Sequence, residues 1–170
     1  MFKNNIAIFG KHAYYMSELD QNQIFNRLID IYVNAPIIGF FYNRKGTEDK
    51  SAPYQDLKKS ILADQVIKET DTLVFIFRLI MLLENSKENS LDERVNRAFR
   101  DDSLKDVSDS HKKNMKLFNS YVLGGIEVLY EKIIDKGATE QDFIKNAYEF
   151  IKEQNLAFTN KSADDFINEL

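Results

Sequence analysis

The longest amphipathic pattern in this chain carries two adjacent glycines at its centre. It spans about residues 111–135, and its apolar stripe consists of Phe118, Val122, Gly125, Ile126, Leu129 and Ile133. A glycine inside a helix costs about 0.5–1 kcal/mol relative to alanine. We expect Gly124 and Gly125 to mark the close approach of another helix, because a surface without side chains permits it. A kink or hinge, and contact with a ligand, are the alternatives.

Helical patterns also dominate the rest of the chain. Residues 73–83, LVFIFRLIMLL, predict a buried core helix with Arg78 on the stripe that reaches solvent or a carboxylate. This run is much shorter than the roughly 20 residues that a membrane span needs. Capping-box patterns at residues 90–93 and 139–142 each open a further helix. One face of an earlier helix is expected to hold Ile24, Phe25, Leu28, Ile29, Tyr32 and Val33.

Evidence for strands is limited to two short segments. Residues 5–9 and 60–63 tolerate β structure and could pair as a minor two-stranded element. A chain of 170 residues matches the size of one domain. We therefore predict a mainly α fold, a compact multi-helix single domain over residues 1–170. Residues 155–170 form a possible partner-docking tail through Phe166, Ile167 and Leu170.

Residues 32–45, YVNAPIIGFFYNRK, place a proline and a glycine within an apolar run. Proline lacks a backbone donor and disfavours helical geometry at the preceding residue, so we expect the helix to kink or restart at Pro36. Gly39 would let the second piece approach a neighbour closely. Arg44 and Lys45 would then begin a solvent loop. Residues 43–53 and 100–110 are predicted to be flexible joins.

The residues offer little for catalysis, metal binding or cofactors. Cysteine is absent, and the only histidines, His12 and His111, lie in no metal-binding motif. The acidic pairs at residues 101–102 and 164–165 are expected to be solvated caps, although a divalent metal is the alternative. We predict no catalytic residue, no metal and no cofactor. The lack of cysteine, and an N-terminal apolar run too short for a secretory signal, favour the cytoplasm.

Basic residues gather in the middle of the chain. Residues 94–116 hold seven Lys or Arg against four Asp, giving +3, whereas residues 117–170 hold five Lys against ten Asp or Glu, giving −5. Arg94, Arg97 and Arg100 are spaced to share one helix face. That face is either solvated or a contact for nucleic acid or a protein. The candidate contact residues are Arg44, Lys45, Arg94, Arg97, Arg100, Lys112 and Lys113.

Two segments resemble a known group of proteins. Residues 22–45, NQIFNRLIDIYVNAPIIGFFYNRK, are similar to a block near the start of small proteins associated with bacterial Dnd-type DNA phosphorothioation operons. Residues 117–132, LFNSYVLGGIEVLYEK, resemble the closing helix of the same proteins. Similar small middle components accompany SMC-like ATPases in Lamassu-type and other three-component anti-phage systems. Pro36 and the acidic extension after residue 135 depart from the pattern.

The resemblance implies a non-enzymatic accessory subunit of a bacterial anti-phage defence complex. Such a subunit would bridge or restrain an SMC-like ATPase and its effector nuclease, which are its implied protein partners. The resemblance allows DNA contact through the complex and implies no membrane. Two alternatives come from other classes. One is a DNA-binding regulator that uses the basic patch, and the other is a metal-dependent phosphoesterase or nuclease.

Overall fold

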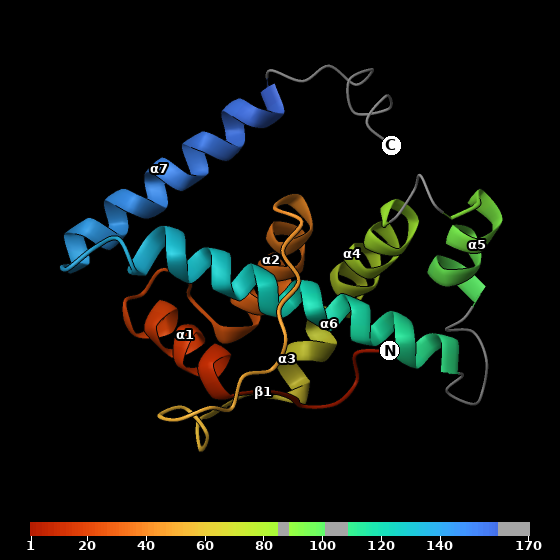
Figure 1. Ribbon diagram of the computed structural model, residues 1–170, viewed down its shortest axis with the longest axis horizontal. Coiled ribbons are helices and arrows are strands. Elements are labelled where there is room, and N and C mark those ends of the chain that lie inside the picture. The colour runs from red at the N-terminus through yellow and green to blue at the C-terminus, as the bar shows by residue number, and fades with distance from the viewer. Residues whose placement is uncertain (85–88, 101–108, 160–170) are drawn as a thin grey trace.

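The long helix with the paired glycines is the axis of the fold. In the computed structural model, which describes residues 1–84, 89–100 and 109–159, α6 (Asp109–Leu129) runs through the middle and the other elements lie around it (Figure 1). Its last turns continue as a π-helical segment, η2 (Tyr130–Ile134). The predicted mainly α fold is confirmed. The other helices are α1 (Gly10–Gln21), α2 (Leu28–Phe41), α3 (Ala63–Lys68), α4 (Thr70–Leu83), α5 (Leu91–Val95) and α7 (Glu140–Thr159).

Helices α2 and α6 cross at their glycines. A Cβ atom added to Gly125 would lie 1.8 Å from the carbonyl oxygen of Ala35, and one added to Gly39 would lie 2.1 Å from that of Tyr121. Each glycine therefore admits the backbone of the other helix where any side chain would collide with it. The predicted helix approach at Gly125, and the close contact at Gly39, are both confirmed. This crossing fixes α2 against the centre of α6.

Of the expected kink or restart of the helix at Pro36, the restart is wrong. Helix α2 continues through Pro36 to Phe41, and both Ala35 and Pro36 are buried. Proline removes a backbone hydrogen bond and strains the preceding turn. Packing of Ala35 against α6 outweighs this local cost. The N-terminal boundary also differs, because Ile24 and Phe25 lie before α2 rather than inside it.

Helix α1 was not anticipated from the sequence. It follows β1 (Ile6–Phe9) directly, and Gly10 at the junction has a φ of +64°, which glycine adopts at no steric cost. Strand β1 pairs antiparallel with β2 (Lys58–Ile61), with Ile6 opposite Ile61. The expected two-stranded element is therefore confirmed. This small sheet and α1 lie on one side of α6 (Figure 1).

The predicted capping boxes are present. Ser90 and Glu93 make reciprocal side-chain to backbone bonds at the start of α5, which continues into η1 (Asn96–Arg100). At the start of α7, the Asp142 amide donates to the Thr139 hydroxyl and the Asp142 carboxylate accepts from the Thr139 amide. The buried helix predicted over residues 73–83 is α4. Its Arg78 guanidinium lies 5.1 Å from the centre of the Phe99 ring.

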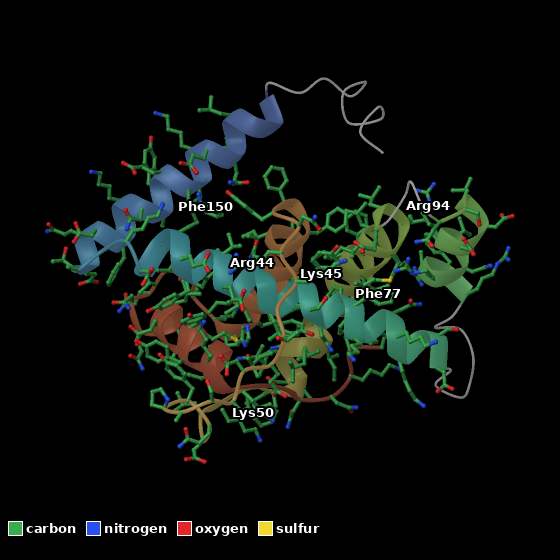
Figure 2. All side chains as sticks on the ribbon, in the orientation of Figure 1. Arg44, Lys45, Lys50, Phe77, Arg94 and Phe150 are labelled. Carbon is green, nitrogen blue, oxygen red and sulfur yellow. The ribbon has the colours of Figure 1, made fainter. Side chains whose placement is uncertain are left out.

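One apolar core joins these helices. Figure 2 shows Phe77 of α4 directed toward α6, where its ring lies 5.7 Å from that of Phe118. Met16 of α1 and Ile29 of α2 are fully buried in the same core. The helices thus form a single compact domain. The predicted docking residues of the tail, Phe166, Ile167 and Leu170, lie outside the described residues.

We predict that Gly125→Ala destabilises the protein by about 2 kcal/mol or more, because the added methyl group collides with the Ala35 carbonyl and must push α2 away. The intrinsic helix preference of alanine acts in the opposite direction, by about 1 kcal/mol. Urea unfolding measures the difference in free energy. The control is Lys113→Ala at an exposed position of α6, which should change the stability by less than about 0.5 kcal/mol. A Gly125→Ala protein more stable than the wild type would contradict the crossing.

Candidate functional site: the strap and clefts along α6

An extended segment crosses α6 and ties three helices together. We call residues 43–50 the strap; it leaves the end of α2, passes over α6 and reaches the start of α1 (Figure 1). The Gly46 amide donates to the Ser120 carbonyl over 2.8 Å, and the Lys11 amide donates to the Asp49 carbonyl over 2.8 Å. The flexible join predicted over residues 43–53 is therefore wrong for the strap, which is bonded to α6 and α1.

The strap approaches α6 at the second of the paired glycines. A Cβ atom on Gly124 would lie 2.0 Å from the Arg44 carbonyl oxygen, and one on Gly46 would lie 2.8 Å from the Gly124 nitrogen. Gly124 and Gly125 thus serve two different neighbours. Gly125 admits α2, and Gly124 admits the strap. The pair lets two segments contact α6 within a single turn.

Arg44 anchors the strap to a partly buried acidic group. Its guanidinium donates to Glu127 and to Glu131, each over 3.0 Å. The other oxygen of the Glu127 carboxylate lies 3.1 Å from Nε2 of His12, whose side chain is 1% exposed. The Nδ1 atom of this ring is buried and has no hydrogen-bond partner among the described residues. Three elements, the strap, α6 and α1, therefore meet at Glu127.

Glu127 is ionised more readily in this position than in water. Burial disfavours the charged carboxylate, but hydrogen bonds from His12 and Arg44 outweigh it and lower the pKa of Glu127 below its ordinary value. The same bond to Glu127 raises the pKa of Arg44, with help from the nearby charge of Glu131. The contact is a charged pair at neutral pH. It joins the partly exposed strap to the interior.

Lys45, the next residue of the strap, makes a second ionic contact. Its ammonium group donates to Glu84 over 2.7 Å and lies 5.2 Å from the centre of the Tyr121 ring. Glu84 follows α4 directly and is only 4% exposed. Its other oxygen accepts a hydrogen bond from the Tyr121 hydroxyl. Burial and this bond raise the pKa of Tyr121, so the tyrosine remains a donor.

The two ionic contacts that hold the strap in place come from residues that are adjacent in the sequence. Arg44 and Lys45 were predicted as contact residues, and each is still about half exposed, with side chains 47% and 42% accessible. Figure 2 shows both where the strap crosses α6. The sequence did not identify their partners Glu84 and Glu127, although each is a lone acid beside an apolar helical run. That pattern is the signal that could have found them.

The predicted arginine face is divided. Arg94 donates to the Leu82 carbonyl over 2.9 Å, and Arg97 donates to the Asn114 side chain over 3.4 Å, so both point toward α4 and α6. Arg100 donates to Asn96 over 2.8 Å at the surface. The reason is the π-helical turn of η1, which departs from the 3.6-residue period on which the common face was predicted.

Lys112 and Lys113 lie in the first turn of α6 and are exposed. Lys112 donates to Asp109 over 3.0 Å, and both side chains remain accessible. These two lysines sit apart from Arg44 and Lys45, which cross α6 a few turns further along. The acidic pairs at residues 101–102 and 164–165 fall outside the described residues. Within residues 1–84, 89–100 and 109–159, no three His, Asp or Glu side chains are grouped as metal ligands would be.

Two adjoining clefts run along α6 beside the strap. The first, of about 410 Å³, lies between α6 and the N-terminal segment 2–9, with buried Tyr32 at its base. The second, of about 610 Å³, continues between the strap and the first turns of α6. The two clefts share four lining residues, which are Glu48, Met115, Asn119 and Leu123. Together they form a continuous hollow along α6.

Comparison with known proteins gave no match: no family model, no curated protein and no solved structure is significantly similar to this chain. Among the helices of the described residues, none is both long enough and apolar enough to cross a membrane.

We predict that Lys45→Met destabilises the protein by about 2 kcal/mol, because it leaves the buried Glu84 carboxylate without its cation. The measurement is urea unfolding at pH 7. Lys145→Met is the matched control, since Lys145 pairs at 3.9 Å with Glu149 and both side chains are exposed. This control should lose less than about 0.5 kcal/mol. Equal losses in the two variants would show that the Glu84 contact is no stronger than a surface pair.

A second prediction concerns pH. Because the folded-state pKa of Glu127 is lowered from 4.5, its stabilising contribution is complete above the unfolded-state pKa and disappears as the pH falls through the folded-state pKa. Glu127→Gln removes this contribution. The stability gap between wild type and Glu127→Gln should therefore be largest at neutral pH and shrink between about pH 5 and pH 3.

Urea titrations across this pH range measure the gap. The control is Glu149→Gln, because among the described residues Glu149 pairs only with the exposed Lys145; the stability of this variant should follow the wild-type curve. A gap between wild type and Glu127→Gln that stays constant down to pH 3 would refute the ionic role of Glu127.

Proposed function

We propose that this chain is a protein-binding accessory subunit with no catalytic role of its own. The proposal rests on a row of apolar side chains that are exposed on the outer face of α7. Ile144, Tyr148 and Ile151 are 59%, 67% and 58% exposed on this face. They are spaced i, i+4 and i+7, which places them within about 60° on one side of the helix. A stripe of this kind on a helix surface is typical of a contact with another helix.

Helix α7 already has a separate face for its own domain. Phe150 packs against Tyr42 with ring centres 6.3 Å apart, and Gln154 donates to the Tyr42 hydroxyl over 2.9 Å. Near its start, Asn146 donates to the Ile133 carbonyl over 3.0 Å. The exposed stripe lies outside these contacts. Helix α7 therefore has two apolar sides. The described residues of the domain pack against one of these sides and leave the other exposed.

The position of α7 also favours an external partner. In Figure 1 it starts beside the end of α6 and diverges from α6 toward its C-terminal end. Its contacts with the domain are chiefly with η2. A projecting helix with an exposed apolar stripe can lie against a long helix without rearrangement of the domain. The antiparallel or parallel packing of two helices at a small angle is the geometry that such a stripe fits.

The partner class follows from the resemblance to middle components of bacterial anti-phage systems. We propose that α7 binds the coiled-coil region of an SMC-like ATPase, and that the chain bridges or restrains this ATPase and an effector nuclease. The ATPase would hydrolyse ATP and the effector would cut nucleic acid. DNA would then be contacted through the complex. The chain itself supplies rigid surfaces, which its strap and helix crossing hold in position.

A DNA-binding regulator has less support from the described residues. The basic residues proposed for that role do not share one face, because Arg94 and Arg97 are turned toward α4 and α6. Lys112 and Lys113 are exposed neighbours in α6, but the other exposed neighbours of the set, Arg44 and Lys45, are already paired with Glu127 and Glu84. The metal-dependent alternative depends on acidic pairs that lie outside the described residues.

We predict that the protein co-purifies with the product of an adjacent gene when the two are co-expressed. Replacing Tyr148 and Ile151 by glutamine should weaken this complex at least about tenfold, because it removes the apolar contact of α7. The measurement is co-purification followed by titration of the isolated partners. A monomer that co-purifies with none of the neighbouring gene products would contradict the proposal.

The matched control places glutamine at Glu149 and Lys152, which are exposed on α7 beside the stripe. This pair of changes should leave the complex intact. Thermal unfolding should be similar for both double variants, since neither alters the face that packs on Tyr42. If the control weakens the complex as much as the stripe variant, the contact is electrostatic and the apolar stripe is not its basis.

A further inference from the structure

Strand β1 has one paired edge and one open edge. The Gly10 amide donates to the Leu57 carbonyl over 2.9 Å, in line with the antiparallel register that places Ile8 opposite Lys59. Bonded residues alternate along an antiparallel pair, so Ile6 and Ile8 direct their backbone groups toward β2. The backbone groups of Ala7 and the amide of Phe9 point the other way, whereas the Phe9 carbonyl accepts the first hydrogen bond of α1. Among the described residues, no backbone hydrogen bond to the Ala7 groups or to the Phe9 amide is found.

The first cleft along α6 follows this strand. It is lined by every residue from Phe2 to Phe9, and across from them by residues of α6 and by Glu48 of the strap. Its base includes Tyr32 and Val122, which are 3% and 1% exposed. The open edge of β1 therefore borders a hollow with an apolar base and polar rims. An extended chain placed there would find backbone donors and acceptors on one side.

An open strand edge is a feature that proteins usually cover, shorten or charge, because it invites pairing with another strand. Here β1 has only four residues, and Ala7, which points its backbone outward, carries a small side chain. Proline is absent from the strand. Apart from the shortness of the strand, neither a proline nor a large side chain at Ala7 blocks this edge.

Charge around the cleft indicates which chains would fit. Lys3 lines the first cleft, and Lys112 and Lys116 line the second, against one lining acid, Glu48, that both share; Lys112 also pairs with Asp109 beside the cleft. This is opposite to the chain as a whole, whose net charge is −4. A segment with alternating apolar and acidic residues would match both the base and the rims. Its acidic side chains would lie near the lysines.

We propose that the cleft binds an extended acidic segment of a partner protein, which adds to β1 as a third strand. This inference rests on the proposed function in taking the partner to be a protein, and it adds a second contact that is independent of α7. Backbone hydrogen bonds to Ala7 and to the Phe9 amide provide affinity, and the lysines select acidic sequences. The partner would then touch the domain on two surfaces of different kinds.

Amide exchange in the full chain tests the open edge first. The amide of Ala7 should exchange faster than that of Ile8, which is bonded to β2. The probe for binding is a short fluorescent peptide of alternating valine and glutamate. Its addition should slow exchange at Ala7 and Phe9. Equal protection of Ala7 and Ile8 in the free chain would overturn the proposal.

The peptide also distinguishes strand addition from other binding. Two further versions of the glutamate peptide carry N-methyl groups on every second backbone amide. In one version the methylated amides are those that face β1, and in the other they are those that face away from it. The version methylated on the amides that face β1 should bind at least about tenfold more weakly than the other. A peptide of alternating valine and lysine should bind less well than the glutamate peptide. Equal binding of all four peptides, or tighter binding of a single-stranded oligonucleotide, would overturn the proposal.

Ala7→Pro provides the matching change in the protein. This change removes a backbone donor from the open edge, where proline is tolerated. It removes no donor from the pairing with β2. Binding of the glutamate peptide should fall at least about tenfold. The Tyr148→Gln, Ile151→Gln variant should bind the peptide like the wild type. If the peptide fails to bind while the complex through α7 persists, only the strand-addition proposal falls.

Discussion

The contact of α2 with α6 through backbone surfaces is the constraint on which the rest of the structure depends. Gly39 and Gly125 place each helix against the carbonyl of the other, so the crossing has no tolerance for a side chain at either position. Once α2 is seated, its end lies beside α6. The strap must then leave α2 directly over Gly124. The location of both ionic contacts follows from this geometry.

The strap converts one crossing into a network that joins the whole domain. Arg44 connects it to Glu127 and through it to His12 of α1, while Lys45 connects it to Glu84 at the end of α4. Each contact pairs a partly exposed cation with a shielded carboxylate. Such pairs contribute more to the stability of the fold than surface pairs do, because water competes less for the carboxylate. Helices that are distant in sequence are thereby held at fixed positions along α6, and the clefts keep their shape.

Much of the fold could be predicted because the signals were local. The stripe of α6, the capping box at Ser90 and the apolar run of α4 each follow from short patterns. The failures had non-local causes. Pro36 stays helical because α6 packs against Ala35, and the strap is ordered by bonds to Ser120 and Lys11 that no local pattern encodes. Arg44 and Lys45 were recognised as charges, but their partners lie 83 and 39 residues away. The open edge of β1 is likewise a result of register and of where α6 lies.

The late position of α6 in the chain has a consequence for synthesis on the ribosome. Helices α1 and α2 and the strap all complete their packing against a helix that begins at Asp109, so they emerge well before their main partner. During this interval their apolar faces, including Ile29 and Met16, have only each other and α4 to cover them. Contacts that span so much of the chain also slow folding, because the loop must close before they form. The nascent N-terminal half is therefore the stage at which exposed apolar surface makes aggregation most favourable.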